Sequence, residues 1–543
     1  MEWQAIQIGE SDVYKKLPKE APGPEVLWSV SDDDQQLNYI IFLALIIFTN
    51  FIAVLFKQRR LCKRFAEFLP ESGFLMLVGC VTSLIFCSIA DYLESEHKPL
   101  RVSIFVIEHV IIPPIILYAA YDLFHPHFFG QIVEILILAI VATALNALIT
   151  ASVLYAVYSS LEAPGFMNFF HTLIYGSIIS AVDPVAVLAV FNSVNADKAL
   201  YFLVFGESLL NDGVTYVMFD GLKDFARMPG EMLSEIPYYS YLLLMASFVI
   251  KPLGGALFGF IMALGSALIT KHTSDDEQIA PLKLLLCVLF AALSYCLSIS
   301  FGFSGIISLI VFGLCQERYT FCNISKHSAA EIVNLVRGVA VIMETLLFFV
   351  LGTRIPDIKI AEVYAFALTT LAVIVMSRTI VTFTLIYFIN KFRNLHPINW
   401  KWQVVIIAGG LRGAIAYAMS LDYNGPFKQM FRETTILIVF ITTLGNGILA
   451  KPLVTLFDLK QESSQDDFDY DKYYGWDAKW KGNYIARWWN WFEDAVLLKY
   501  FTKSHKKQSA ADKEKTEKIE EKIYEDLDRD MHDRESCRSF NFR

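Results

Sequence analysis

The sequence predicts an all-α polytopic membrane protein with about thirteen transmembrane helices. Of its 543 residues, 55% are hydrophobic and only 19% are charged, whereas soluble domains carry about 25% charged residues. Apolar runs of roughly 18 residues or more, the length that spans a bilayer, recur between about residues 38 and 457. A polar segment, 1–37, precedes these runs, and a charged tail, 458–543, follows them.

We expect the spanning segments at 38–57, 73–91, 101–123, 130–158, 167–192, 199–222, 238–269, 281–300, 302–316, 332–353, 360–390, 403–421 and 432–457. The eighth and ninth, which meet near Gly302, are alternatively one broken helix. Basic residues in short loops favour the cytoplasmic side, and the loop 57–64 is the strongest basic cluster among them. This predicts an N-terminus outside the cell or in a lumen and a C-terminus in the cytoplasm.

The sequence predicts no resident metal, cofactor or disulfide framework. The eight cysteines are scattered, and His125-Pro126-His127 offers too few ligands for a zinc site. The net charge of −9 gives no reason to expect nucleic-acid binding. The apolar segments contain neither HExxH nor Gly-x-Ser-x-Gly, which argues against a membrane protease.

Acidic residues inside the apolar segments are the strongest sign of function, because an ionisable group at the bilayer centre costs about 2.5–3.5 kcal/mol. The fifth segment contains Asp183-Pro184. Proline removes a helical hydrogen bond, and irregular backbone is tolerated in a membrane only where it is buried in protein or lines a cavity. The alternative is a simple kink in which Asp183 caps the second half of the helix.

The sixth segment carries Glu207, Ser208, Asn211 and Asp212. Helical spacing places Glu207 and Asn211 on one stripe and Ser208 and Asp212 on the next. The Ser208 hydroxyl and the Asp212 carboxylate can therefore face one hard cation, which prefers oxygen ligands. The alternative is a polar seam between helices.

The twelfth segment contains the run GGLRGA, in which glycines, among them Gly410, surround Arg412. Such a run makes a weak helix and permits close packing. The fifth and twelfth segments are the penultimate members of two sets of six, and interrupted helices at corresponding positions indicate a midplane site between inverted repeats. Arg378 and Glu344 are also intramembrane charges that need partners, and Glu207 is the expected partner of Arg378.

Three runs resemble the signatures of the animal sodium/hydrogen exchangers, a family of the cation/proton antiporter superfamily. They are SAVDPVAVLAVF from Ser180, FGESLLND from Phe205 and GGLRGAIA from Gly409, and the resemblance covers roughly residues 38–457. It implies the sodium/proton antiporter fold, with two inverted six-helix repeats, crossed broken helices, an elevator-like mobile core and a homodimer. The core would comprise about 130–222 and 360–457, and the dimerisation helices about 38–123 and 281–353.

The resemblance also implies roles for single residues. Asp212 would bind sodium and protons in turn, Asp183 would be the acid at the helix crossing, and Asn211 is typical of members that exchange one sodium for one proton. The remaining implied roles are a structural ion pair, Glu207 and Arg378, and support of the crossing by Pro184, Arg412, Gly410 and Glu344. Two departures from the family are Tyr118, where many relatives have Asp, and Gly213, which replaces the usual Ala and implies a looser helix.

The implied function is electroneutral sodium/proton exchange that regulates intracellular pH and sodium, at the plasma membrane rather than in an organelle. Sodium and protons, with lithium or potassium as further candidates, are transported substrates and not cofactors. A cation channel or non-transporting sensor on the same fold, and a potassium-accepting organellar exchanger, stay open as alternatives.

The tail contains a tryptophan-rich amphipathic stretch at about 477–502. Relatives carry a helix after the last span that binds a calcineurin-B-homologous protein, and Trp488–Phe501 is the candidate here for filling a hydrophobic groove. The same pattern serves equally well for a helix that lies on membrane lipids with its tryptophans at the headgroups.

Overall fold

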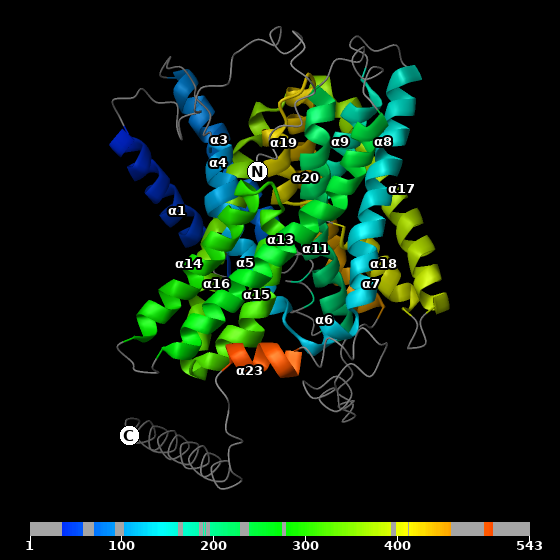
Figure 1. Ribbon diagram of the computed structural model, residues 1–543. Helices are drawn as coiled ribbons and strands as arrows, with labels where there is room; N and C mark the ends of the chain where they lie inside the picture. Colours follow the sequence, from blue (N-terminus) through cyan, green and yellow to red (C-terminus); the bar gives the residue numbers. More distant parts are fainter. Residues whose placement is uncertain are drawn as a thin grey trace, which may run out of the picture.

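The protein, described by a computed structural model, is a bundle of long helices that run roughly side by side (Figure 1). The structure describes residues 35–57, 70–92, 102–160, 167–183, 188, 191, 196–227, 238–273, 279–392, 398–410, 412–457 and 493–502. Pro184, nearly all of the N-terminal segment and most of the tail, including Trp488, lie outside these residues.

The helices of the first half are α1 (Gln35–Lys57), α3 (Glu71–Tyr92), α4 (Ile104–Val106), η3 (Ile107–Ile111), α5 (Ile112–Leu123), α6 (Pro126–Gly130), α7 (Ile132–Leu136), η4 (Ile137–Ala142), α8 (Thr143–Ser160), α9 (Phe169–Ser180) and α11 (Lys198–Arg227). Those that follow are α13 (Tyr238–His272), α14 (Ala280–Ser300), α15 (Gly305–Cys315), η5 (Gln316–Thr320), η6 (Phe321–Asn323), α16 (Lys326–Thr353), η7 (Ile355–Asp357), α17 (Ile360–Phe392), α18 (Trp400–Ala408), α19 (Ala414–Asp422), α20 (Lys428–Leu456), η8 (Glu493–Leu497) and α23 (Leu498–Phe501).

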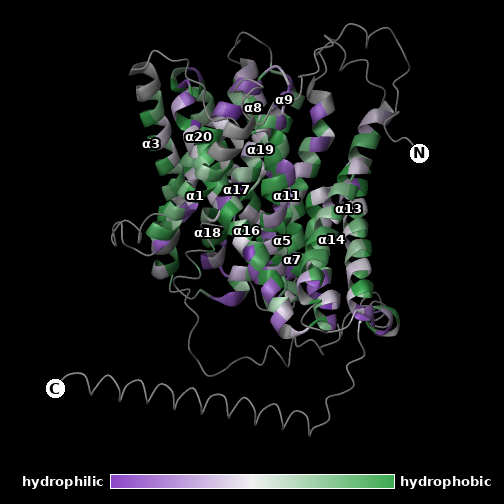
Figure 2. Cartoon of the chain, turned by 90° about the vertical axis from the view of Figure 1, so that its left-hand side faces the viewer, coloured by the Kyte–Doolittle hydropathy of each residue, from purple (hydrophilic) through white to green (hydrophobic). Residues whose placement is uncertain are grey.

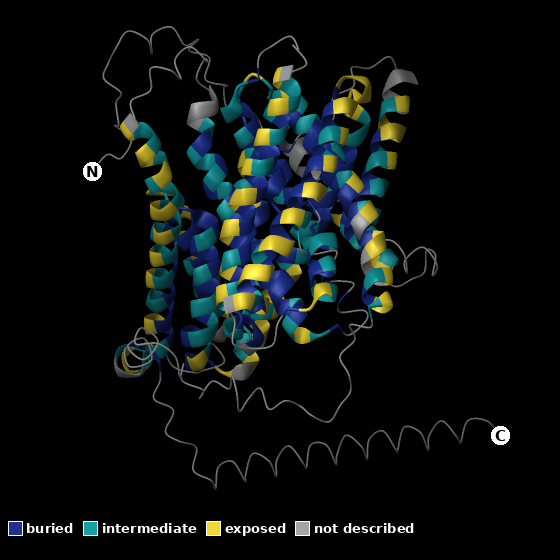
Figure 3. Cartoon of the chain, turned by 90° about the vertical axis from the view of Figure 1, so that its right-hand side faces the viewer, coloured by how far each residue is buried: buried dark blue, intermediate teal, exposed yellow. Residues whose placement is uncertain are grey.

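The prediction of an all-α polytopic membrane protein is confirmed. Among the described residues, eight helices are long and apolar enough to cross a membrane, and each predicted segment overlaps a helix. Apolar residues dominate the length of these helices (Figure 2). Large apolar side chains such as Ile47, Leu242 and Leu368 are exposed on the outside of the bundle, where Figure 3 also shows exposed positions. This is the surface that hydrocarbon would cover.

The segments that meet near Gly302 form two helices and not one broken helix. α14 ends at Ser300 and α15 begins at Gly305, and Gly302 between them has φ +77°, a conformation that suits glycine. The hydroxyls of Ser294 and Ser308 lie 2.7 Å apart, so the two helices run antiparallel around this turn.

Two helices end inside the bundle, where the sequence predicts interruptions. α9 stops at Ser180, and the backbone at Ala181 is extended, with φ −60° and ψ 134°. α18 stops at Ala408, and α19 resumes at Ala414. Carbonyl groups at the end of a helix lose their intrahelical partners, so both interruptions need donors from elsewhere in the protein.

Glycines bring α13 and α15 into close contact. A methyl group added at Gly255 would lie 2.4 Å from the carbonyl oxygen of Ser304, and one added at Gly259 would lie 2.2 Å from that of Ser308. These two glycines are four residues apart on one face of α13, the spacing that lets helix backbones approach closely in membranes. The contact fixes α15 against α13.

We expect Gly259→Ala to destabilise the protein by about 1–3 kcal/mol, because the new methyl group would displace a backbone and not a flexible side chain. Gly338→Ala is the matched control, since nothing lies within 4 Å of a methyl group at that position of α16. Thermal denaturation of the purified protein in detergent measures both. Equal melting temperatures for the two variants would contradict the close packing of α13 on α15.

Candidate functional site

The two interrupted helices cross at Asp183 and Gly413. A methyl group added at Gly413 would lie 2.4 Å from Cβ of Asp183 and 2.9 Å from its Oδ2, so only glycine fits beside this aspartate. Gly413 is the N-cap of α19. The Asp183 carboxylate therefore lies at the N-terminal end of α19, where the helix dipole favours a negative charge.

Arg412 supplies donors to the end of α9. Its Nη1 donates to the carbonyl oxygen of Ser180 at 3.1 Å and to that of Ala181 at 3.4 Å. The Arg412 side chain is only 2% exposed, and its backbone N–H donates to Oγ1 of Thr442 at 3.2 Å. A buried cation thus compensates the negative end of a helix that stops within the bundle.

Arg378 of α17 does the same for α18. Its Nη2 donates to the carbonyl oxygen of Ile406 at 3.0 Å and lies 3.2 Å from Oε2 of Glu207. A methyl group at Gly410 would lie 2.5 Å from Nε of Arg378, so this glycine makes room for the guanidinium. The structure therefore brings together Glu207 and Arg378, and it places Gly410 against Arg378.

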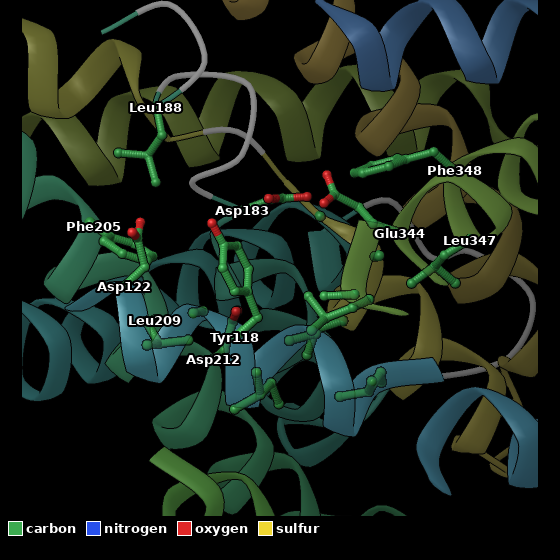
Figure 4. Close-up of a pocket in the computed structure, with 18 of the residues that line it drawn as sticks. Tyr118, Asp122, Asp183, Leu188, Phe205, Leu209, Asp212, Glu344, Leu347 and Phe348 are labelled. Carbon is green, nitrogen blue, oxygen red and sulfur yellow. The ribbon is translucent and has the colours of Figure 1, made fainter. Parts of the chain in front are cut away.

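A cavity of about 280 Å³ lies beside the crossing (Figure 4). Asp183, Asp212 and Glu344 all line it. Its walls come from α5, α11, α16 and the start of α19. In Figure 4 the carboxylates of Asp183 and Glu344 point toward each other. The cavity thus joins the two interrupted helices to α5 and α16.

Asp212 differs in its partners from two other acids of α11, Glu207 and Asp220. Glu207 pairs with Arg378, and Asp220 pairs with Lys223 and Lys251. Among the described residues, no lysine or arginine forms an ion pair with Asp212, which is 7% exposed. A buried carboxylate without a basic partner is costly, so a proton or a cation from the cavity is the remaining way to neutralise it.

Ser208 and Asn211 are buried but are not among the residues that line the cavity. Nδ2 of Asn211 donates to Oγ1 of Thr143 on α8 at 2.5 Å. Ser208 is 0% exposed. The role of Ser208 and Asn211 as ion ligands therefore stays a prediction.

Gly213, next to Asp212, is packed tightly, since a methyl group there would lie 2.7 Å from Cγ1 of Ile307.

Sequence reasoning missed Asp122, which also lines the cavity. Asp122 is exposed near the end of α5, and the Tyr201 hydroxyl, in the first turn of α11, donates to its Oδ2 at 3.3 Å. Tyr118, one helical turn before it, lines the cavity too. The available signal was the four-residue spacing from Tyr118, which places both residues on one helix face. The cavity thus reaches the end of the bundle that holds Asp122.

Comparisons with known proteins show the family of this chain. The profile of the family described as "Sodium/hydrogen exchanger, transmembrane" matches residues 47–456. Sodium/hydrogen exchanger 3 of Homo sapiens is 34% identical over 413 residues, which are 75% of this chain and 48% of that protein. Na(+)/H(+) exchanger protein 7 of Caenorhabditis elegans is 32% identical over 414 residues, 74% of this chain and 51% of that protein. The chain thus spans about half the length of these relatives.

The fold resembles that of a solved antiporter. The sodium proton antiporter MjNhaP1 from Methanocaldococcus jannaschii, in an electron-microscopy structure, superposes with a TM-score of 0.59 at 16% identity. The match covers 79% of this chain and 99% of that one. Since the family profile extends over most of the chain and includes the crossing and α11, this protein belongs to the sodium/hydrogen exchanger family.

Proposed function

We propose that this protein exchanges sodium for protons across a membrane, one for one, with Asp212 as the carrier group. One observation carries the proposal: Asp212 lines the cavity, and no basic residue among those described pairs with it. Its charge is then open to compensation by either substrate. The relatives are sodium/hydrogen exchangers, which supports the same activity here. Asn211 beside Asp212 supports the one-to-one stoichiometry that the family resemblance implies.

Exchange follows from the cost of burying a bare carboxylate. A protonated or sodium-bound Asp212 is neutral, so the helices that carry it can move across the apolar barrier. The empty, ionised form cannot, because a bare carboxylate in a low-dielectric region is too costly. Each passage therefore needs one of the two ions, and sodium movement in one direction is coupled to proton movement in the other.

An elevator-type movement of the core fits the walls of the cavity. Asp183 and Asp212 lie on the segments assigned to the mobile core, whereas Glu344 lies on α16, which is assigned to the stationary part. We propose that the first two residues travel with the ion while α5 and α16 stay in place. Asp183, at the N-terminal end of α19, would assist ion binding, and Glu344 would face it in one of the two states.

The protein would act as a homodimer in the plasma membrane, with a cytoplasmic C-terminus, and would regulate intracellular pH and sodium. These proposals rest on the family resemblance and on the basic loop 57–64. Lithium and potassium are further candidate substrates. An organellar, potassium-accepting exchanger is the second candidate, and comparing the three cations at several pH values with the membrane potential clamped would distinguish the two.

A calcineurin-B-homologous protein is the proposed partner of the tail. In the described part of that tail, Leu497 is 1% exposed and packs against Ala267 and Tyr319. Oε1 of Glu493 lies 2.9 Å from Nε of Arg318. The segment that a partner would bind is thus docked on α13 and η5, so we propose that the partner binds after this contact opens.

Asp212→Asn should abolish exchange, because the amide neither releases a proton nor carries the charge that binds sodium. The measurement is proton movement driven by a sodium gradient in proteoliposomes that contain the full chain. Asp357→Asn, the same change at an exposed acid, should leave the rate within about twofold, as surface substitutions usually do. Exchange that survives Asp212→Asn would refute the carrier role, and ion conductance without stoichiometric coupling would favour a channel.

Arg378→Ala should lower stability by about 3–5 kcal/mol, the cost of leaving one partner of a buried ion pair uncompensated. Arg337→Ala, at an exposed position of α16, is the control, and thermal denaturation in detergent is the measurement. A protein that keeps its melting temperature but loses exchange would show instead that Arg378 acts in transport.

Arg318→Ala should strengthen binding of the calcineurin-B-homologous partner about two- to fivefold, because it removes an ion pair that holds the tail on the transporter. Isothermal titration of the purified full chain with the partner measures the affinity, with Arg337→Ala as the control. Absence of binding to both the unmodified chain and the variant would rule out this partner.

A further inference from the structure

Four charged side chains form a second cluster around α11, away from the crossing. Nζ of Lys251 lies 2.5 Å from Oδ2 of Asp220. Nζ of Lys223 lies 2.6 Å from Oδ1 of Asp220 and 3.9 Å from Oδ2 of Asp422. We call Asp220, Lys223, Lys251 and Asp422 the ionic clasp; they come from three helices, α11, α13 and α19.

The clasp is partly shielded from solvent. The four side chains are between 24% and 28% exposed, whereas the ion pair between Lys359 and Glu362 is 62% and 64% exposed. Charges near a protein surface attract more strongly as water is removed from around them, so the clasp contributes more than a fully solvated pair. It therefore tends to hold the three helices together.

The clasp lies beyond the cavity along α11. Asp212, Tyr216 and Asp220 follow at four-residue spacing and share one face of the helix, with about 12 Å between the first and last at 1.5 Å per residue. Tyr216 packs against both of the large apolar clusters of the protein. Along α11, with increasing distance from Asp122, the Asp212 carboxylate comes first, the packed ring of Tyr216 second and the clasp third.

The clasp also lies where α11 meets α13 closely. A methyl group added at Gly221, the residue after Asp220, would lie 2.9 Å from Cε1 of Phe248 on α13. Phe248 is one helical turn before Lys251. The ion pair between Lys251 and Asp220 therefore joins two helices that are already in contact, through Gly221 and the side chain of Phe248.

We propose that the ionic clasp is the gate that closes the transport path at the end of the bundle remote from Asp122. This inference rests on the proposed exchange function. α13 is packed closely on α15, which lies in the part assigned as stationary, so we place α13 with that part. For Asp212 to face the other side, α11 and α19 must then move relative to α13. The contacts of Lys223 with Asp220 and Asp422 stay within the moving helices, whereas the pair between Lys251 and Asp220 has to open. Lys251 is thus the residue whose charge holds the gate shut.

The test measures access to the cavity from each side of the membrane. The full chain, with its eight cysteines replaced, receives Ala340→Cys, which places a thiol in the cavity wall. A membrane-impermeant thiol reagent is added to one side or the other of oriented vesicles. With the clasp intact, we expect rapid labelling only from the side on which Asp122 is exposed.

Lys251→Glu should raise labelling from the opposite side about tenfold, in the range of typical conformational coupling, because two acids would then face each other. Adding Asp220→Lys to Lys251→Glu should restore the original rate of labelling from that side, since the two exchanged charges attract each other again. Lys251→Gln, a milder change, should move labelling in the same direction. Lys359→Glu is the control, because the pair it reverses is local and exposed.

Equal labelling for Lys251→Glu, Lys251→Gln and Lys359→Glu would overturn the gate, and so would failure of Asp220→Lys to reverse the effect of Lys251→Glu. Sodium-driven proton movement is recorded in the same vesicles before labelling. The cysteine-replaced chain with Ala340→Cys keeps both the clasp and Asp212. Absence of sodium-driven proton movement in that protein would count against the proposed function. Intact exchange with unchanged labelling counts against the gate alone.

Discussion

Two helices end inside the bundle, and the carbonyl groups at those ends must find donors, since hydrocarbon supplies none. Two buried arginines meet this requirement. Arg412 donates to Ser180 and Ala181 at the end of α9, and Arg378 donates to Ile406 near the end of α18. Without these contacts, each interruption would leave unpaired carbonyls at a cost of several kcal/mol per group.

The rest of the site follows from this requirement. Two guanidinium groups in the interior need room and compensating charge. Gly410 leaves space for Arg378, and Gly413 lets the backbone pass Asp183. Glu207 balances Arg378. The crossing is therefore a set of partnered charges and dipoles, and the proposed mechanism adds one variable charge beside it, at Asp212.

Much of this arrangement could be predicted from the sequence because it is encoded locally. Proline after Asp183 and glycines around Arg412 mark the interruptions, and the high cost of a lone intramembrane arginine predicts an acidic partner for Arg378. The position of Asp122 at the cavity and the docking of Leu497 on Tyr319 could not be predicted. Both depend on which distant helices pack together, and the spacing of residues within one segment does not determine that packing.

Three of the acids on α11, Glu207, Asp212 and Asp220, show that the partners of a carboxylate, and not its residue type, decide what it does. Glu207 faces a guanidinium that is fixed by a carbonyl, so its charge is permanently compensated. Asp220 faces two lysines, of which Lys251 lies on another helix, so its compensation depends on how those helices are arranged. Asp212 has no such partner among the described residues. Only a charge left uncompensated by the protein can be compensated by a transported ion. In the proposed mechanism, one helix therefore supplies the structural ion pair, a gate residue and the carrier.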